Sequence, residues 1–147
     1  MKIAIGSDEK THLTDSVIQE LQKSGHQLML HGALGTGVTL WPTVAASVAK
    51  EVTTGKAEQG ILFCWTGTGI SMAANKMAGI RAALCQDAET ARGARTWNDA
   101  NILVMSLRAT SEAVAKEILR AWFDTRPSEK EEDVECFRLL KDLDRSR

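Results

Sequence analysis

The chemistry that this chain can perform centres on Cys64. This cysteine ends an apolar run, and the segment that follows it, 65–71, has the sequence WTGTGIS. A thiol placed beside the N-terminus of a helix is favoured as a thiolate, which acts as a base or a nucleophile. A cysteine at the end of a strand is also a common small core residue. The position therefore makes Cys64 a candidate for catalysis, with packing as the alternative.

The turn after Cys64 has the composition of an anion site. Gly67 and Gly69 let the backbone approach a ligand closely. The predicted helix that begins there supplies unpaired N–H groups at the positive end of its dipole. Such a nest holds a phosphate, a carboxylate or an oxyanion that forms only during a reaction. A tight strand-to-helix turn also requires glycine, so this spacing alone does not decide between structure and function.

A second polar segment, Gly6–Glu9, follows the first predicted strand. In an open parallel sheet, ligands bind beyond the carboxyl ends of the strands, where loops lead into helices. Both polar segments occupy that place in the predicted fold. We therefore expect Asp8 and Glu9 to lie on the same edge of the sheet as Cys64.

Short apolar runs alternate with helix-sized segments along the chain, which is typical of right-handed βαβ units and a parallel sheet. Several runs are apolar without alternation, as in strands that are covered on both faces. The predicted fold is a three-layer α/β sandwich with a five-stranded parallel sheet and a C-terminal helix. The strands are predicted at 2–5, 27–30, 60–65, 81–85 and 101–106, and the helices at about 13–24, 43–54, 70–77, 88–96, 110–123 and 131–143.

Size and composition limit the functions available. A chain of 147 residues fits a single domain, 1–147, and its formal charge of -1 disfavours nucleic acid as a partner. No apolar stretch reaches the roughly 20 residues that span a bilayer, and the N-terminal apolar run is too short for a signal peptide. A soluble, cytoplasmic protein is expected.

The cysteines argue against a disulfide framework and against a structural zinc site. There are three of them, Cys64, Cys85 and Cys136, and none forms a CxxC pair. Cys85 and Cys136 lack the glycine-rich surroundings of Cys64. We predict that both are packing residues, and we predict no metal site.

The last predicted helix, about 129–144, carries an apolar stripe. Its members are Val134, Phe137, Leu140 and Leu143, which recur every three residues. Such a stripe must dock on an apolar surface. In a chain of this size, a second copy of the chain is the candidate.

The segment 60–84 resembles the signature of the ribose-5-phosphate isomerase B and galactose-6-phosphate isomerase family. The usual signature runs Cys-Gly-Thr-Gly-x-Gly-x-Ser, then Ala-Asn-Lys and Gly-Ile-Arg-Ala. This chain has CWTGTGIS at 64–71, AANK at 73–76 and GIRA at 79–82. Further similarity at 2–8, at 98–101 and at Arg108 extends the resemblance to about residues 1–125.

The resemblance implies an aldose–ketose isomerase with a Rossmann-like fold and no metal or nucleotide cofactor. It implies a homodimer, with a tetramer as the alternative, whose active sites lie across the subunit interface. Cys64 would move a proton between C1 and C2 through a cis-enediolate, and Thr66 would support the sugar or the thiolate. Asp8 would hold sugar hydroxyls, and Asn98 would reach in from the partner subunit. The oxyanion would bind the nest, whose members are Gly67, Thr68, Gly69, Ile70 and Ser71.

The chain departs from the family where the family binds phosphate. The usual Asp-His pair is Asp8-Glu9, and a carboxylate at Glu9 repels a phosphate. The family's C-terminal arginines fall near Glu135 and Leu139. Three cations on one face of the last helix are either a solvated charged surface or a relocated anion site; they are Arg138, Lys141 and Arg145.

Three tryptophans, Trp41, Trp65 and Trp97, occupy positions that surround the site in the family. Trp97 replaces the histidine that is credited with opening the sugar ring, and an indole cannot shuttle a proton near neutral pH. Core filling is the alternative role for a tryptophan. Indole faces stack on sugars, so the three together favour a pocket that reads carbohydrate shape more than phosphate charge.

These observations predict an isomerase that acts on a sugar, a sugar acid or a sugar phosphate, and that uses ribose 5-phosphate poorly. A short sugar that cannot cyclise needs no ring opening, while Arg108 and the nest can still attract an anion. The alternatives are a conventional ribose-5-phosphate isomerase B with a relocated phosphate site and a non-catalytic carbohydrate-binding protein. A nucleotide-binding domain is disfavoured, because no later glycine and no lysine follow Gly69 in the required spacing.

Overall fold

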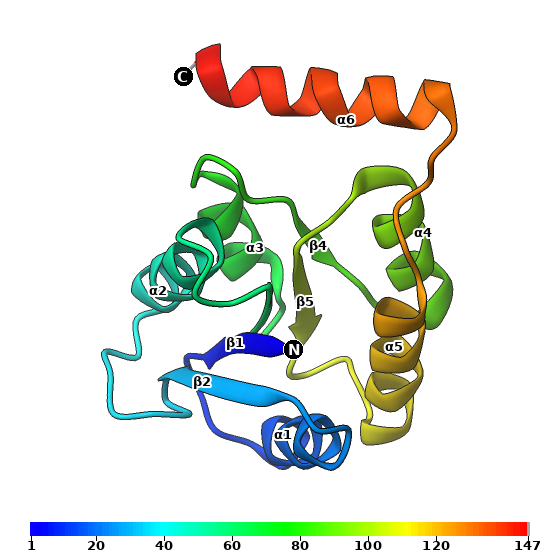
Figure 1. Ribbon diagram of the computed structural model, residues 1–147. Helices are drawn as coiled ribbons and strands as arrows, with labels where there is room; N and C mark the ends of the chain where they lie inside the picture. Colours follow the sequence, from blue (N-terminus) through cyan, green and yellow to red (C-terminus); the bar gives the residue numbers. More distant parts are fainter. Residues whose placement is uncertain (147) are drawn as a thin grey trace.

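Five parallel strands form the middle layer of the computed structural model, which describes residues 1–146 (Figure 1). The sheet order is β2-β1-β3-β5-β4, and every pair of neighbours is parallel. The strands are β1 (Lys2–Ser7), β2 (Gln27–Gly32), β3 (Gln59–Cys64), β4 (Ala82–Leu84) and β5 (Ile102–Ser106). The predicted five-stranded parallel sheet is confirmed.

Helices cover both faces of this sheet. The helices are α1 (His12–Lys23), α2 (Trp41–Thr53), α3 (Thr68–Asn75), α4 (Ala88–Asn98), α5 (Glu112–Asp124) and α6 (Glu131–Leu143), followed by the short 3₁₀ helix η1 (Asp144–Ser146). One apolar cluster joins the sheet to α1, α4 and α5, and a second joins it to α2 and α3. The three-layer prediction is therefore confirmed.

Strand β3 explains why its run is apolar without alternation. Ile61 and Phe63 belong to the cluster under α1, α4 and α5, whereas Leu62 and Cys64 belong to the cluster under α2 and α3. Each of the four is at most 6% exposed. Both faces of the strand are buried, so both sets of side chains are apolar.

Helix α2 packs closely against β1 and β2 because each of these strands has a glycine where it contacts the helix. A Cβ added to Gly6 would lie 2.7 Å from Val44 Cγ1 and 2.9 Å from Val48 Cγ2. At Gly32 the same addition would lie 2.6 Å from Val44 Cγ2. Interiors packed to this density leave little room for movement. The start of α2, at Trp41, is thereby fixed relative to the carboxyl edge of the sheet.

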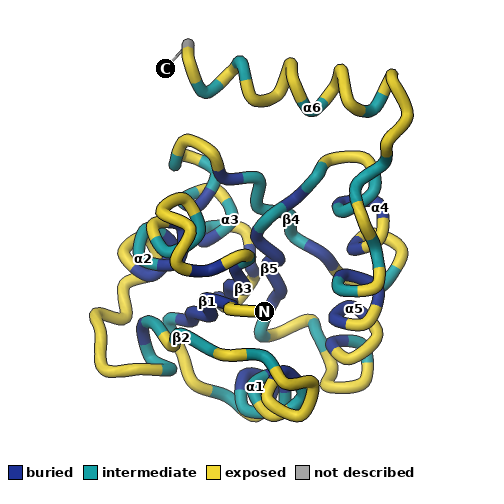
Figure 2. The backbone as a smooth tube through the Cα atoms, in the orientation of Figure 1, coloured by how far each residue is buried: buried dark blue, intermediate teal, exposed yellow. Residues whose placement is uncertain are grey.

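Helix α6 stands apart from the layered body, at the top of Figure 1, and Figure 2 shows no buried residue along it. Its apolar side chains are open, with exposed fractions of 48% for Val134, 41% for Leu140 and 60% for Leu143. Cys136 is also exposed, so the prediction that it is a packing residue is wrong. A helix of this length gains most of its stability from packing, so its apolar face must be buried against another apolar surface.

No helix in residues 1–146 is long and apolar enough to cross a membrane. Cys85 is buried, as predicted, and burial raises the pKa of its thiol to about 12. The single domain over 1–147 and the cytoplasmic location stay predictions.

Candidate active site

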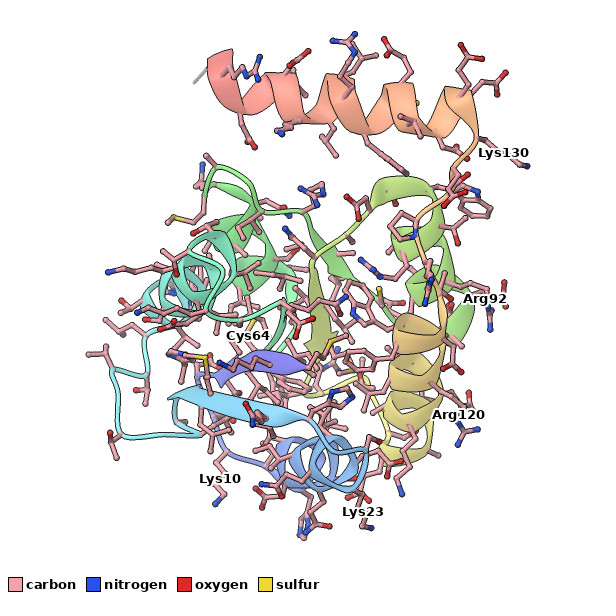
Figure 3. All side chains as sticks on the ribbon, viewed as in Figure 1. Lys10, Lys23, Cys64, Arg92, Arg120 and Lys130 are labelled. Atoms are coloured by element: carbon pink, nitrogen blue, oxygen red, sulfur yellow. The ribbon has the colours of Figure 1, made fainter. Side chains whose placement is uncertain are left out.

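The carboxyl edge of the sheet brings the two predicted polar segments together. In the register of the sheet, Ser7 lies opposite Phe63, and Cys64 lies opposite Ser106. The residue after β1, Asp8, therefore lies beside the end of β3, where Cys64 stands. Figure 3 labels Cys64 in the interior of the molecule, next to β1, and only 6% of its surface is exposed.

The end of β3 is tied to the loop that follows β5. The carbonyl oxygen of Trp65 accepts hydrogen bonds from Ser106 Oγ at 2.9 Å and from the backbone N–H of Arg108 at 3.1 Å. These bonds hold Arg108 next to the segment that begins at Cys64. The Arg108 side chain is exposed, and no acidic partner for it is found within residues 1–146. An unpaired cation thus lies at this edge.

Helix α3 begins without a side-chain cap. Its N-cap residue, Gly67, has a φ of 78°, and no side chain accepts a hydrogen bond from the first turn. Helices α1, α4 and α5, by contrast, are capped by Thr11, Asp87 and Ser111. The first N–H groups of a helix have no partner inside it. At α3 these groups are left open towards a ligand.

Glycine is required at this turn for two reasons. A φ of 78° is strained for any residue with a side chain. A Cβ on Gly67 would also lie 2.5 Å from Leu84 Cδ1 and 3.3 Å from the carbonyl carbon of Met105. The turn that presents the amides of α3 is therefore also a packing contact with β4 and β5.

The nest is smaller than the sequence predicts. The N–H of Ser71 donates to the Gly67 carbonyl at 3.2 Å, as an ordinary helical bond. The Ser71 amide is therefore engaged, and the open donors are those of Thr68, Gly69 and Ile70. Thr66 Oγ1 and Thr68 Oγ1 lie 2.8 Å apart and share a hydrogen bond. One of these two hydroxyls can turn outward to a ligand while the other supports it.

The Asp8 carboxyl is partly buried and incompletely bonded. The buried hydroxyl of Ser7 donates to the Glu9 carbonyl and accepts from the Glu9 N–H at 3.2 Å, which fixes the turn. Asp8 Oδ1 is shielded from solvent and has no hydrogen-bond partner. Burial raises the pKa of the Asp8 carboxyl, and the charge of Glu9 adds to this, against the lowering effect of backbone donors. Glu9 itself is exposed.

Two of the three predicted pocket tryptophans border this edge. The Trp41 indole lies against Gly69, with ring atoms Cε2, Cε3 and Cη2 each 3.5 Å from the position of a Cβ on that glycine. Trp65 follows Cys64 directly and is 58% exposed. Neither indole fills the core, so the packing alternative does not hold for them.

Trp97 and Asn98 do not lie near Cys64 in the same chain. They end α4, just before β5 begins, and so lie at the amino edge of the sheet, opposite the edge that carries Cys64. Trp97 is 61% exposed. Asn98 lines a hollow of about 390 Å³ under α6, together with Ile80 and Leu140. Any part that these two residues play at an active site requires a second chain.

Two residues of the signature have a structural role that the sequence does not reveal. The Asn75 side chain accepts from the N–H of Ala82 at 2.8 Å and donates to its carbonyl at 2.9 Å, which anchors β4 to α3. Arg81 forms an ion pair with Asp99 at 3.0 Å. The second half of the signature therefore shapes the sheet edge and the end of α4.

The charged face of α6 is largely neutralised by its own acids. Arg138 pairs with Glu135 and with Asp142, at 2.7 Å in each case. Arg145 lies 3.6 Å from Asp142. These pairs favour the solvated-surface interpretation over a relocated anion site, although Lys141 takes no part in them. The residues that the structure describes contain no group of three metal-binding side chains.

The fold and this edge define a class of α/β sugar isomerases, and comparison with known proteins identifies it. The Ribose/Galactose Isomerase family matches residues 3–136, so the chain belongs to that family. This membership confirms the resemblance seen in the sequence and the prediction of an aldose–ketose isomerase. The roles of the individual site residues stay predictions.

Relatives and solved structures agree with this assignment. Ribose-5-phosphate isomerase B of Escherichia coli is 38% identical over 122 residues, which cover 82% of each chain. D-erythrulose-4-phosphate isomerase of Pectobacterium atrosepticum is 37% identical over 126 residues, which cover 84% of this chain and 83% of the relative. The structure of ribose-5-phosphate isomerase B from Clostridium thermocellum superposes with a TM-score of 0.91 at 33% identity over 99% of both chains.

The raised pKa of Asp8 predicts a pH-dependent cost in stability. A carboxyl whose pKa is raised by folding stabilises the fold while protonated, and this contribution is lost as the pH rises through the folded pKa. Asp8→Asn should therefore raise the urea midpoint at pH 7, and the gain should vanish below about pH 4. Glu117→Gln, at an exposed position in the middle of α5, is the control and should leave the urea midpoint unchanged. An unchanged midpoint for Asp8→Asn at pH 7 contradicts the prediction.

Proposed function

We propose that Cys64 is the base of an aldose–ketose isomerase. The single observation that carries this is the position of the thiol, at the end of β3 and one turn before the uncapped N-terminus of α3. Base and oxyanion donors are thus held on one rigid strand-turn-helix unit. Such preorganised donors stabilise charge that develops only in the transition state.

The reaction is a proton transfer between neighbouring carbons. The Cys64 thiolate removes the proton from C2 of the aldose, and the C–H electron pair forms the C1=C2 bond of a cis-enediolate. The amides of Thr68, Gly69 and Ile70 stabilise the oxygen that gains charge. The thiol then returns a proton to C1, and the proton of the O2 hydroxyl passes to O1, which leaves a ketone at C2 and a hydroxyl at C1. Asp8 and Thr66 orient the hydroxyls.

We propose a sugar phosphate that requires no ring opening as the substrate. Trp97 replaces the ring-opening histidine of the family pattern, so a furanose is a poor substrate. A four-carbon sugar that carries phosphate on O4 cannot close a furanose ring. The unpaired Arg108 favours an anionic group on the substrate, and the relative from Pectobacterium atrosepticum is named for a substrate of this size.

The site is completed by a second chain in this proposal. Trp97 and Asn98 are exposed at the edge opposite Cys64, and α6 leaves its apolar face open. A twofold dimer pairs the same two surfaces twice, so one chain's Asn98 can serve its partner's Cys64 and the reverse. Burial of the α6 stripe in the same contact supplies the packing that this helix lacks.

The first test removes the base. Cys64→Ser should lower kcat by about three or more powers of ten, because a hydroxyl is a far weaker base than a thiolate at pH 7. Ketose formation from erythrose 4-phosphate, followed by NMR, is the measurement. Cys136→Ser removes an exposed thiol and serves as the control with unchanged turnover. Normal turnover by Cys64→Ser eliminates the assignment.

The second test concerns substrate choice. We expect kcat/KM for ribose 5-phosphate to lie below about 10⁴ M⁻¹s⁻¹, the lower end of the ordinary enzyme range, and that for erythrose 4-phosphate to lie above it. Ribose 5-phosphate closes to a furanose, and Trp97 cannot shuttle the proton that reopens this ring, whereas erythrose 4-phosphate needs no ring opening. Unphosphorylated sugars and sugar acids complete the series. An efficient reaction with ribose 5-phosphate refutes this choice.

The third test is subunit complementation. Chains with Cys64→Ala and chains with Asn98→Ala should each be inactive, yet a mixture should recover activity. A mixed dimer contains one site in which both residues are intact, so recovery should approach about one quarter of the wild-type rate when the chains exchange freely. Mass spectrometry of differently labelled chains verifies the exchange. If exchange occurs without recovery, the shared site is wrong.

A further inference from the structure

The Trp41 indole lies face-on over the first turn of α3. Atoms Cε2, Cε3 and Cη2 alternate around the six-membered ring, and all three are 3.5 Å from the Cβ position of Gly69. A point equidistant from three alternate ring atoms lies on the axis of the ring. The ring face therefore covers Gly69, whose N–H is one of the open donors of α3. The other side of Trp41 borders solvent, since the residue is 41% exposed.

The position of the Trp41 indole is fixed by the helix that carries it. Trp41 is the first residue of α2, Pro42 follows it in the first turn, and Val44 packs over Gly6 and Gly32. Proline in the first turn of a helix is preorganised for the helical conformation. An indole that is attached to such a rigid helix start keeps its position through a reaction cycle.

The thiol of Cys64 is buried against α3, the helix whose first turn the indole of Trp41 covers. Cys64 is a member of the apolar cluster between the sheet and the helices α2 and α3, together with Val44 and Ile70. Its exposed fraction is 6%, whereas the neighbouring Trp65 and Thr66 are exposed. Val44 lies in the first turn of α2 and Ile70 in the first turn of α3, and the indole of Trp41 joins these same two turns.

We propose that Trp41 shields the proton on Cys64 from water, so that the hydrogen removed from C2 is the one returned to C1. This rests on the proposed function of Cys64. The C2–H bond breaks and the S–H bond forms, and then the S–H bond breaks and the C1–H bond forms. No proton is gained or lost by the thiol over the cycle. Trp41 acts as a positioning residue, because water exclusion also strengthens the hydrogen bonds to the enediolate.

The test follows the hydrogen itself. Erythrose 4-phosphate that carries deuterium at C2 is converted in ordinary water, and the deuterium found at C1 of the ketose is measured by mass spectrometry at low conversion. The wild-type protein should retain a measurable share of the label. Trp41→Ala should lower that share by about tenfold and lower kcat more than it changes KM, with Trp41→Phe in between.

The matched control is Leu40→Ala, which removes the adjacent apolar side chain, 67% exposed, and should leave the retained share unchanged. Partial misfolding lowers the amount of active protein but not the share of label retained per turnover, so a purely structural role of Trp41 leaves this ratio constant. If Trp41→Ala does not fold, the share of deuterium retained by Trp41→Phe is compared with that of the wild type instead. Equal retention in wild type and variant overturns the proposal, as does complete loss of label in the wild type.

Failure of this proposal differs from failure of the proposed function. If Cys64→Ser abolishes conversion while the Trp41 variants retain the label like wild type, Cys64 is the base and the shielding role is wrong. If Cys64→Ser converts the sugar at the wild-type rate, the thiol does not carry the proton and both proposals fall together.

Discussion

The left-handed turn at Gly67 is the constraint on which the candidate site depends. Its φ of 78° lets the chain leave β3 and enter α3 within three residues of Cys64. Its missing side chain lets the turn pack against Leu84 and Met105. Any other residue would have to move either β4 and β5 or the start of α3. The position of the Cys64 thiol relative to the open amides of α3 would then change.

The carboxyl edge of the sheet gathers several exceptions to local structural rules. Helix α3 has no side-chain cap, Asp8 Oδ1 is buried without a partner, and Trp65 is exposed. Each of these features costs stability or solubility when it has no compensating role. Their occurrence at one edge is expected of a binding site, where unpaired polar groups and exposed rings find their partners in a bound ligand. Similar exceptions occur on α4, where Arg95 Nε is buried without a partner and Trp97 is 61% exposed.

Local patterns in the sequence were sufficient to predict the strands and helices. The strand predicted at 60–65 is Gln59–Cys64, because an apolar run between glycine and polar residues has few alternative structures. The helix predicted at 70–77 begins earlier, at Thr68, because Gly67 supplies the N-cap position. The motifs placed Asp8 on the same edge of the sheet as Cys64, because the carboxyl ends of parallel strands share one edge. That β1 and β3 are neighbours, with Ser7 opposite Phe63, comes from the structure.

Contacts between distant segments could not be predicted in the same way. The stacking of Trp41 on Gly69 depends on how closely α2 approaches the sheet, and this is set by Val44 against two glycines. The exposure of Cys136 depends on α6 leaving the body, which no local pattern encodes. The engaged amide of Ser71, by contrast, is a local feature, because it follows from the helix beginning at Thr68 and not at residue 70 as predicted.

The division between retained and altered positions has a physical logic. Proton transfer requires a base and oxyanion donors at fixed separation, and the proposed base, Cys64, and the open amides lie on the single unit from β3 to α3, where a small shift would cost rate. The residues proposed for substrate recognition instead lie on separate loops, such as Glu9 and Arg108, and, in the proposed dimer, on a second chain, such as Trp97. Those positions can change one at a time without moving Cys64. A family built in this way can change its sugar while it keeps its chemistry. The replacements at Glu9 and Trp97 fall on the side that is free to vary, whereas Trp65 replaces a glycine within the unit from β3 to α3 and projects to solvent, with 58% of its surface exposed.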